Sequence, residues 1–344
     1  MNDRTHQPSA ARRAVLDHLL ALIADSPWAE SLVLRGSAVM PAWVGAAARE
    51  PADLDWILLP STLVPVDPRD PYPHLPDLAP VRHWPEAADG AGAYEMWRFE
   101  DFDTRGLRAR LPPEGLHWVP AAEPEADGPH QVLRALVERH PQVAPGIRLD
   151  PDSVVETGGW SYWPPSTDEE RDDADHGEPG VRVALRWTAE GTGGGEVTVD
   201  FARDERMPQP PVRTAVPRAW AGAGAGVGGS GTTGPGATTV LTASRELSLA
   251  WKLLWLRADG ERARAKDLYD AVLLAELCAH TLDPALLRRV LAREPGHPGT
   301  LRPADLTAPP ADWAALRAAH PAATGTADAW LARLRTALAP LTDR

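Results

Sequence analysis

The stretch Pro51-Ala-Asp-Leu-Asp-Trp-Ile-Leu-Leu59 places two carboxylates at the head of an apolar run that predicts a buried strand over residues 53–59. Side chains alternate along a strand, so Asp53 and Asp55 project from the same face. Two neighbouring carboxylates repel each other, and burying them unpaired is costly. A divalent cation would resolve both problems, but a solvated strand edge also explains the pair. The two residues alone leave both interpretations open.

Length and composition limit the class of protein. A chain of 344 residues is long enough for one large or two ordinary domains. No apolar run approaches the roughly 18–20 residues of a membrane span, and the first residues lack the apolar core of a signal peptide. The single cysteine, Cys278, excludes an intrachain disulfide and a cysteine-rich zinc site. We therefore expect a cytoplasmic protein without a membrane association.

The formal net charge of −13 argues against a surface that binds nucleic acid everywhere. The acidic residues are concentrated in the middle of the chain, whereas the segment 241–300 carries nearly equal numbers of both signs. A local basic groove for a polyanion therefore stays compatible with the composition.

The N-terminal part predicts alternating strands and helices. The stretch Ser31-Leu-Val-Leu-Arg-Gly-Ser37 predicts a strand that ends at a Gly-Ser pair. Helical spacing of apolar residues predicts helices over 9–26, 38–48 and 130–139. Residues 181–188 and 196–201 predict a hairpin around the Gly-rich turn 191–195.

Two segments show little periodicity. Residues 60–127, rich in Pro, Asp and Glu, predict an irregular acidic insertion with a strand near 94–98, and residues 164–180 predict an acidic loop. The Gly-rich segment 221–240 predicts a flexible linker and is not a Walker loop, because no Gly-Lys-Ser/Thr follows.

The C-terminal part predicts helices only, over residues 244–256, 263–279, 284–293 and 327–338. The chain therefore predicts an α/β domain over 1–220, a linker over 221–240 and a helical domain over 241–344.

Gly36 and Ser37 stand where a predicted strand gives way to a helix. Glycine lets a backbone approach a phosphate, and the first N–H groups of a helix attract anions. A plain turn with a serine cap explains the same two residues.

Asp200 ends the predicted strand Glu196-Val-Thr-Val-Asp200 and could be a third metal ligand or a general base, or simply cap a turn. Lys252 lies on a predicted helix and could neutralise triphosphate charge, with Asp267 holding it in place. Exposed pairs on helix surfaces would explain Lys252 and Asp267 equally well.

The ordered combination resembles the nucleotidyltransferase superfamily and, within it, the AbiEii/AbiGii-type toxin family that includes MenT-like enzymes. That family shows Gly-Gly or Gly-Ser, an Arg four residues before Asp-x-Asp, a later strand Asp, a helical Lys and an Arg-Asp-x-x-Asp segment. The matching residues here are Gly36, Ser37, Arg49, Asp53, Asp55, Asp200, Lys252 and Lys266-Asp267-Leu-Tyr-Asp270. The chain departs from the pattern at Pro51, where Ser or Thr is usual, and at Lys266, which replaces Arg.

The resemblance implies a small mixed sheet flanked by helices, with a helical C-terminal domain, and transfer of a nucleoside monophosphate from a triphosphate to a hydroxyl, typically at a tRNA 3′ end. It implies a toxin with an antitoxin partner. It also implies Mg²⁺ as the cofactor. The implied metal ligands are Asp53, Asp55 and Asp200, the implied catalytic residues are Asp200, Lys252 and Asp267, and the implied nucleotide-binding residues are Gly36, Ser37, Arg49 and Lys252.

Two alternatives remain at this stage. The same chemistry could act on a small hydroxylated compound of the aminoglycoside type. Such a substrate is cationic, and the acidic insertion would attract it. A non-catalytic protein could also retain the fold.

Overall fold

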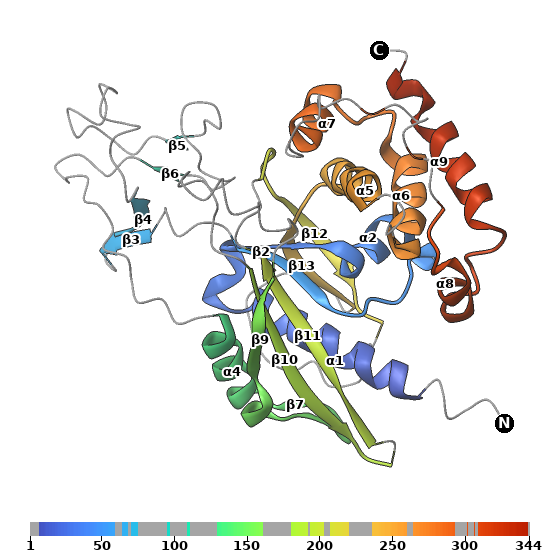
Figure 1. Cartoon of the computed structure of the whole chain (residues 1–344). Helices are drawn as coiled ribbons and strands as arrows, with labels where there is room; N and C mark the ends of the chain where they lie inside the picture. Colours follow the sequence, from blue (N-terminus) through green and yellow to red (C-terminus); the bar gives the residue numbers. More distant parts are fainter. Residues whose placement is uncertain are drawn as a thin grey trace, which may run out of the picture.

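The computed structural model describes residues 7–58, 64–67, 70–74, 95–96, 109–110, 129–160, 180–191, 193–202, 207–219, 236–259, 264–292, 301, 306 and 309–342. Within these residues a mixed sheet of nine strands runs through the centre of the molecule (Figure 1). The strand order is β12-β13-β1-β2-β11-β10-β8-β7, and β9 pairs with β10 off this path. The strands are β1 (Leu32–Arg35), β2 (Leu54–Leu58), β7 (Gln142–Ala144), β8 (Ile147–Leu149), β9 (Val155–Trp160), β10 (Gly180–Ala189), β11 (Gly193–Ala202), β12 (Val212–Pro217) and β13 (Ala237–Thr242).

The pairing of β2 decides how the two halves of the chain meet. β2 pairs antiparallel with β1, its neighbour in sequence, and parallel with β11, which begins far downstream at Gly193. Parallel neighbours need a long connection between them, and here it contains the whole insertion and the first strand of the β10–β11 hairpin. The head of β2 and the end of β11 are thereby placed side by side.

Helices α1 (Gln7–Ala24) and α4 (Pro129–Arg139) cover one face of the sheet. Leu54 and Trp56 of β2 point into this layer, together with Val199 and Phe201 of β11. Because side chains alternate along a strand, the residues between them face the other side of the sheet.

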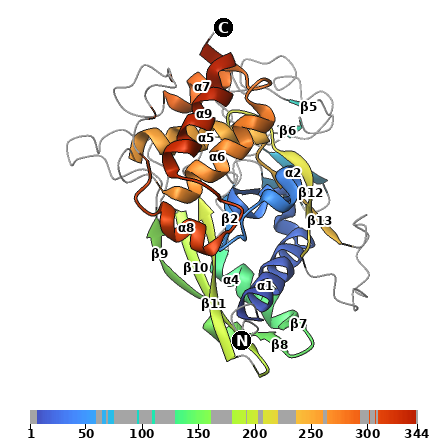
Figure 2. The same cartoon turned by 90° about the vertical axis from the view of Figure 1, so that its right-hand side faces the viewer.

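The other face of the sheet packs against the C-terminal helices (Figure 2). Val33 and Ile57 belong to one apolar cluster with residues of α5, α6, α7 and α9. The helical part therefore shares its core with the sheet. These helices are α5 (Arg245–Asp259), α6 (Ala265–Cys278), α7 (Pro284–Leu291), α8 (Trp313–Ala319) and α9 (Ala327–Thr342). None of the helices in the described ranges is long and apolar enough to cross a bilayer.

The structure confirms the α/β class, the strands β1 and β2, the β10–β11 hairpin and the predicted helices α1, α4, α5, α6, α7 and α9. Asp283 caps α7 by accepting a hydrogen bond from the backbone N–H of Ala285 at 2.8 Å. A strand near residues 94–98 is present as β5 (Glu95–Met96), which pairs with β6 (Ala109–Arg110).

The structure differs from the sequence prediction in several details. The helix predicted over 38–48 is a 3₁₀ turn (Gly36–Ala38), the short helix α2 (Met40–Val44) and a second 3₁₀ turn (Gly45–Ala47). Residues 193–195 extend β11 instead of forming a turn, and residues 237–240 begin β13 instead of ending the linker. Helix α8 and the strands β7, β8, β9 and β12 were not predicted.

Residues 221–235 of the predicted linker lie outside the described residues, as does nearly all of the acidic loop predicted over 164–180. The same holds for most of the predicted insertion, apart from β5, β6 and a separate pair, β3 (Val64–Asp67) with β4 (Asp70–His74).

Val199 tests how far the α1 layer supports the end of β11. Its side chain is 0% exposed, whereas Val155 of β9 is 49% exposed. We expect Val199→Ala to lower the free energy of unfolding by about 2 kcal/mol, because it removes two buried methylene equivalents. Val155→Ala, the same chemical change on an exposed strand, should stay within about 0.5 kcal/mol of the wild type. Urea denaturation followed by circular dichroism measures both; equal losses would contradict the expected packing.

Candidate active site

One row of charged side chains crosses four strands of the sheet. Arg35 of β1 is paired with Asp55 of β2, Asp55 with Asp200 of β11, and Asp200 with Arg182 of β10. Residues paired across neighbouring strands project from the same face. This is the face on which Val33 and Ile57 meet the C-terminal helices. The two acidic residues thus lie in the middle of the row, with an arginine at each end.

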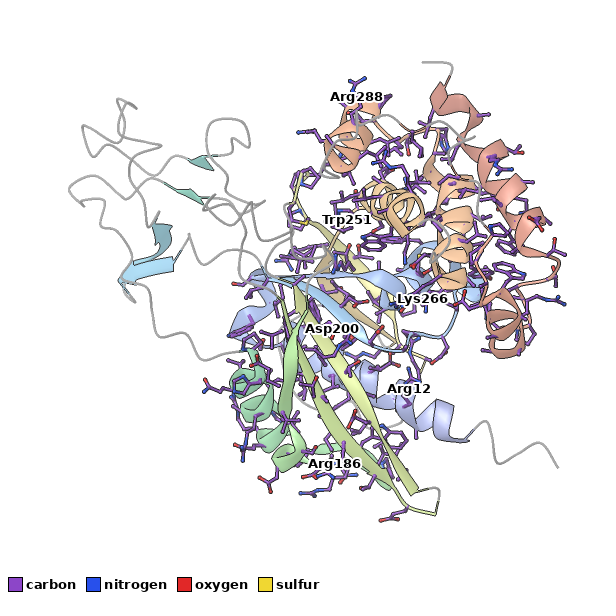
Figure 3. All side chains as sticks on the ribbon, in the orientation of Figure 1. Arg12, Arg186, Asp200, Trp251, Lys266 and Arg288 are labelled. Atoms are coloured by element: carbon purple, nitrogen blue, oxygen red, sulfur yellow. The ribbon has the colours of Figure 1, made fainter. Side chains whose placement is uncertain are left out.

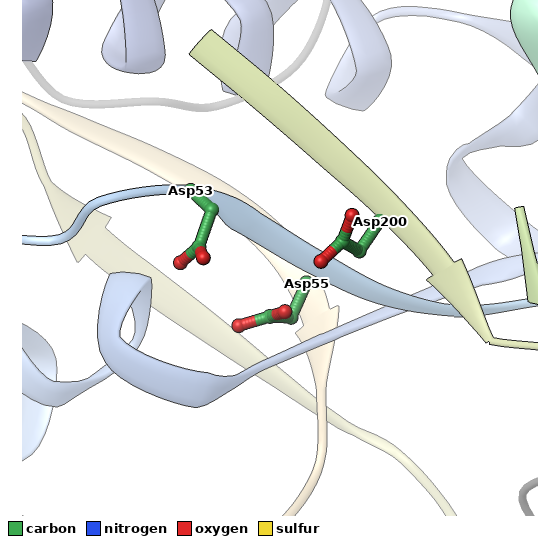
Figure 4. Close-up of side chains that lie close together, drawn as sticks. All are labelled: Asp53, Asp55 and Asp200. Carbon is green, nitrogen blue, oxygen red and sulfur yellow. The ribbon is translucent and has the colours of Figure 1, made fainter. Parts of the chain in front are cut away.

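Asp53, just before β2, adds a third carboxylate to the two central ones (Figure 4). One oxygen from each of Asp53, Asp55 and Asp200 lies within 4.8 Å of the others. Asp200 is only 2% exposed, whereas Asp53 and Asp55 are partly exposed. Three carboxylates converging on one point suit a hard divalent cation such as Mg²⁺, which prefers oxygen ligands. The residues present therefore fit a metal site.

The Gly-Ser turn lies directly against this cluster. Gly36 has φ of +76°, and a Cβ at this position would collide with Oδ2 of Asp55. Only glycine satisfies both conditions. The Ser37 hydroxyl is buried and has no hydrogen-bond partner among the residues that the structure describes. The 3₁₀ turn that begins here has three residues, so a strong helix dipole is not available. The backbone and hydroxyl donors of the turn are the groups suited to an anion.

The carboxylate cluster is electrostatically strained. Removal of water from around the carboxyl, together with the Asp53 carboxylate, raises the pKa of Asp55 to about 7, and Arg35 opposes this rise. Arg35 is buried, with its guanidinium 5.7 Å and 5.8 Å from the ring centroids of Trp251 and Trp255 on α5. It thus supplies a positive charge, fixed in place, on the strand next to Asp55.

Lys252 and Arg49 belong to a second, buried network. The Lys252 ammonium donates to Oδ1 of Asp267 at 2.6 Å and lies 3.4 Å from Oδ2 of Asp270. Arg49 binds the Asp270 carboxylate through Nε and Nη2 at 3.0–3.2 Å. Although burial disfavours its charged form, Asp267 and Asp270 raise the pKa of Lys252 above its ordinary value. Two cations and two anions thus balance one another between α5, α6 and the segment before β2.

The sequence analysis assigned both cations of this network to the nucleotide, and the structure shows both already engaged by carboxylates. Lys266 lies at the start of α6 (Figure 3) and has no ion pair with the described residues. Its positive charge acts to lower the pKa of both Asp55 and Asp267.

The structure brings the sequence-predicted residues together in two neighbouring groups. Gly36, Ser37, Asp53, Asp55 and Asp200 form the first, and Arg49, Lys252 and Asp267 belong to the second. Sequence reasoning missed Arg35 and Arg182, and it gave no role to Asp270. Arg35 directly precedes the Gly-Ser pair, a position that offered a signal, whereas Arg182 is recognisable only from the strand register.

Two carboxylate-bearing strands, with a Gly-Ser turn pressed against them, thus form a cluster that fits a divalent cation. Residues 162–343, more than half of the chain, match the family model described as "Nucleotidyl transferase AbiEii toxin, Type IV TA system". The chain belongs to this family of nucleotidyltransferase toxins, which act in toxin–antitoxin systems and therefore with an antitoxin partner. Asp200, Lys252 and Asp267 lie inside the matched region, and Asp53 and Asp55 lie outside it.

Solved structures give a weaker likeness. MenT4, a nucleotidyltransferase toxin from Mycobacterium tuberculosis H37Rv, is 18% identical with a TM-score of 0.47, over 98% of this chain and 85% of that one. A protein from H. pylori, provisionally classified as a nucleotidyltransferase, is 12% identical with a TM-score of 0.42, over 98% and 94% of the two chains. No curated protein matches the sequence.

The raised pKa of Asp55 predicts a pH-dependent stability. Between the ordinary value of 3.8 and about 7, the folded chain keeps a proton that the unfolded chain has lost. The contribution of Asp55 to stability is therefore present at low pH and is lost as the pH rises through this window. In Asp55→Asn this loss should be absent, so the stability of the wild type relative to the variant should fall between about pH 4 and 7. Urea unfolding with a chelator at several pH values tests this; parallel pH profiles would contradict it.

The buried network predicts a large cost for removing Lys252. Lys252→Met leaves Asp267 and Asp270 with one counter-charge fewer, and breaking a buried ion pair costs about 3–5 kcal/mol. Lys266→Met makes the same change one residue before Asp267 and should alter stability by about 0.5 kcal/mol or less. Chemical denaturation distinguishes them. Similar values for both variants would show that Lys252 does not hold the network together.

Proposed function

We propose that this chain transfers a nucleoside monophosphate from a nucleoside triphosphate to the 3′-terminal hydroxyl of a tRNA, in a reaction that depends on Mg²⁺. The observation that carries the proposal is the convergence of Asp53, Asp55 and Asp200 beside the Gly36 turn, in a member of a nucleotidyltransferase family. The metal, the roles of the individual residues and the acceptor are parts of this proposal.

Asp53, Asp55 and Asp200 would hold Mg²⁺. When bound, the cation would offset the charge that develops on the phosphate oxygens. In the reaction, the acceptor oxygen forms a bond to the α-phosphorus, the bond to the β-phosphate bridging oxygen breaks, and pyrophosphate leaves. Asp200 would accept the hydroxyl proton, because its carboxylate lies in the same cluster as Asp53 and Asp55, next to the reacting phosphate.

The donors of the Gly36-Ser37 turn would bind the outer phosphates, and the unpartnered Ser37 hydroxyl supports this role. Lys252, held by Asp267, and Arg49 would act on the triphosphate mainly through their charge, because their donors already serve Asp267 and Asp270. Lys266, at the start of α6 and without an ion pair among the described residues, would be the cation available for a direct phosphate contact.

The test incubates the purified protein with Mg²⁺, total tRNA and each α-labelled nucleoside triphosphate. We expect label in RNA with one or more nucleotides, and weaker transfer at higher salt, because a polyanionic acceptor binds through phosphate contacts. Asp53→Asn and Asp55→Asn should each lower the rate by about 100-fold or more, because they remove charge stabilisation at the reacting phosphate.

Asp328→Asn provides the matched control, because Asp328 is exposed on α9, away from the cluster, and should leave the rate unchanged. Label recovered in a small-molecule filtrate instead of RNA would assign the chemistry to a different acceptor. Failure to transfer label from any of the four nucleotides to RNA, protein or small molecules would refute the proposed reaction.

A further inference from the structure

Arg182 engages both oxygens of a carboxylate that the metal site also needs. Its Nε donates to Oδ1 of Asp200 at 2.7 Å, and its Nη2 donates to Oδ2 at 2.6 Å. Asp200 is also one of the three converging carboxylates. Each guanidinium hydrogen bond occupies one lone-pair site of the carboxylate, and the positive charge of Arg182 repels a cation at the same carboxylate. Arg182 and a metal ion therefore compete for the same side chain.

The surroundings of Arg182 allow it to move. Its side chain is 46% exposed, whereas the Asp200 side chain is 2% exposed. Its cross-strand neighbour on β9 is Gly158, where even a Cβ would meet nothing within 4 Å. The register of β9 and β10 also shifts between Arg182 and Val183, and such irregularities re-aim side chains. Because the Arg182 side chain is 46% exposed, a shift of its guanidinium away from Asp200 would not open a buried cavity.

Arg35, at the opposite end of the charge row, has the contrary environment. It is buried and lies near the rings of Trp251 and Trp255. Its positive charge is therefore fixed in place. The two arginines that flank the carboxylates thus differ: the buried one is permanent, and the exposed one can be exchanged.

We propose that Arg182 is a positioning residue that serves as the exchangeable counter-ion of Asp200. It neutralises and orients the carboxylate before a divalent cation binds, and it releases at least one oxygen when the cation arrives. This assignment rests on the metal-dependent function proposed above and is independent of the acceptor.

The proposal fixes the sign of a measurable effect. Without Arg182 a divalent cation no longer competes with a bidentate guanidinium, so it should bind about tenfold more tightly. The metal-free protein should at the same time become less stable, because Asp200 faces Asp55 without its counter-ion. A purely structural role predicts the opposite change in affinity, because a disordered Asp200 would be a poorer ligand.

The experiment measures Mn²⁺ and Mg²⁺ affinity by calorimetry on the full chain without nucleotide, and thermal unfolding with and without Mg²⁺. The variants are Arg182→Gln and Arg182→Lys, with Arg186→Gln as the control. Arg186 is exposed on the same strand and the same face, and it pairs with Asp150 at 3.6 Å instead of with the cluster. The substitution Arg186→Gln removes the same charge without releasing the Asp200 carboxylate.

We expect a dissociation constant about tenfold lower for Arg182→Gln, an intermediate value for Arg182→Lys, and little change for Arg186→Gln. Arg182→Gln should also show the largest upward shift in unfolding temperature on addition of Mg²⁺. If Arg182→Gln does not fold, Arg182→Lys carries the test, because it keeps the charge and loses the bidentate contact.

Two failures are distinguishable. A wild-type chain that binds neither cation would refute the metal site and, with it, the role of Arg182. A wild-type chain that binds cations, with Arg182 variants that bind them equally or more weakly, would refute only the exchangeable counter-ion. Tighter binding by the variants would support that role even if no tRNA were labelled.

Discussion

The pairing of two like charges in register, Asp55 on β2 and Asp200 on β11, is the constraint on which the rest of the site depends. Carboxylates on neighbouring strands repel, and the backbone ladder prevents them from separating. An arginine on each side of the pair offsets this repulsion. Arg35 lies next to Asp55 in the row and Arg182 lies next to Asp200, so each carboxyl group of the pair has an arginine as its other cross-strand neighbour.

The helical part is tied to this row through aromatic and ionic contacts. The ring of Trp255 on α5 lies 5.8 Å from the Arg35 guanidinium and 5.1 Å from the Lys252 ammonium. Lys252 in turn joins α5 to Asp267 and Asp270 of α6, and Asp270 binds Arg49 ahead of β2. The C-terminal helices therefore help to set the electrostatics of the strands, in addition to covering them. This agrees with a family match that contains Asp200 and Lys252, while the structure supplies Asp53 and Asp55 from outside it.

The sequence was sufficient for the class of fold, the main helices and the residues that converge, because apolar periodicity and the Asp-x-Asp spacing are local signals. It was insufficient wherever register decided the outcome. A turn centred on residues 191–195 would have paired Arg186 with Asp200, whereas the true turn lies before Gly193 and pairs Arg182 with it. Gly194 and Gly195 are strand residues that pair with Thr188 and Trp187, and the absence of a Cβ at both positions leaves room for Trp187 across the hairpin. The buried ion pair of Arg49 could not be predicted from the sequence either, since its partner Asp270 lies more than 200 residues further along the chain.

The parallel pairing of β2 and β11 has a consequence for how such a site can vary. Neighbouring strands lie about 4.8 Å apart because backbone hydrogen bonds fix that spacing. The backbones that carry Asp55 and Asp200 are therefore held apart by a distance that no side-chain substitution can lengthen or shorten by much. The cation preference of such a site can therefore change through the flanking charges and through Asp53. Asp53 precedes β2, so the spacing between paired strands does not fix its position.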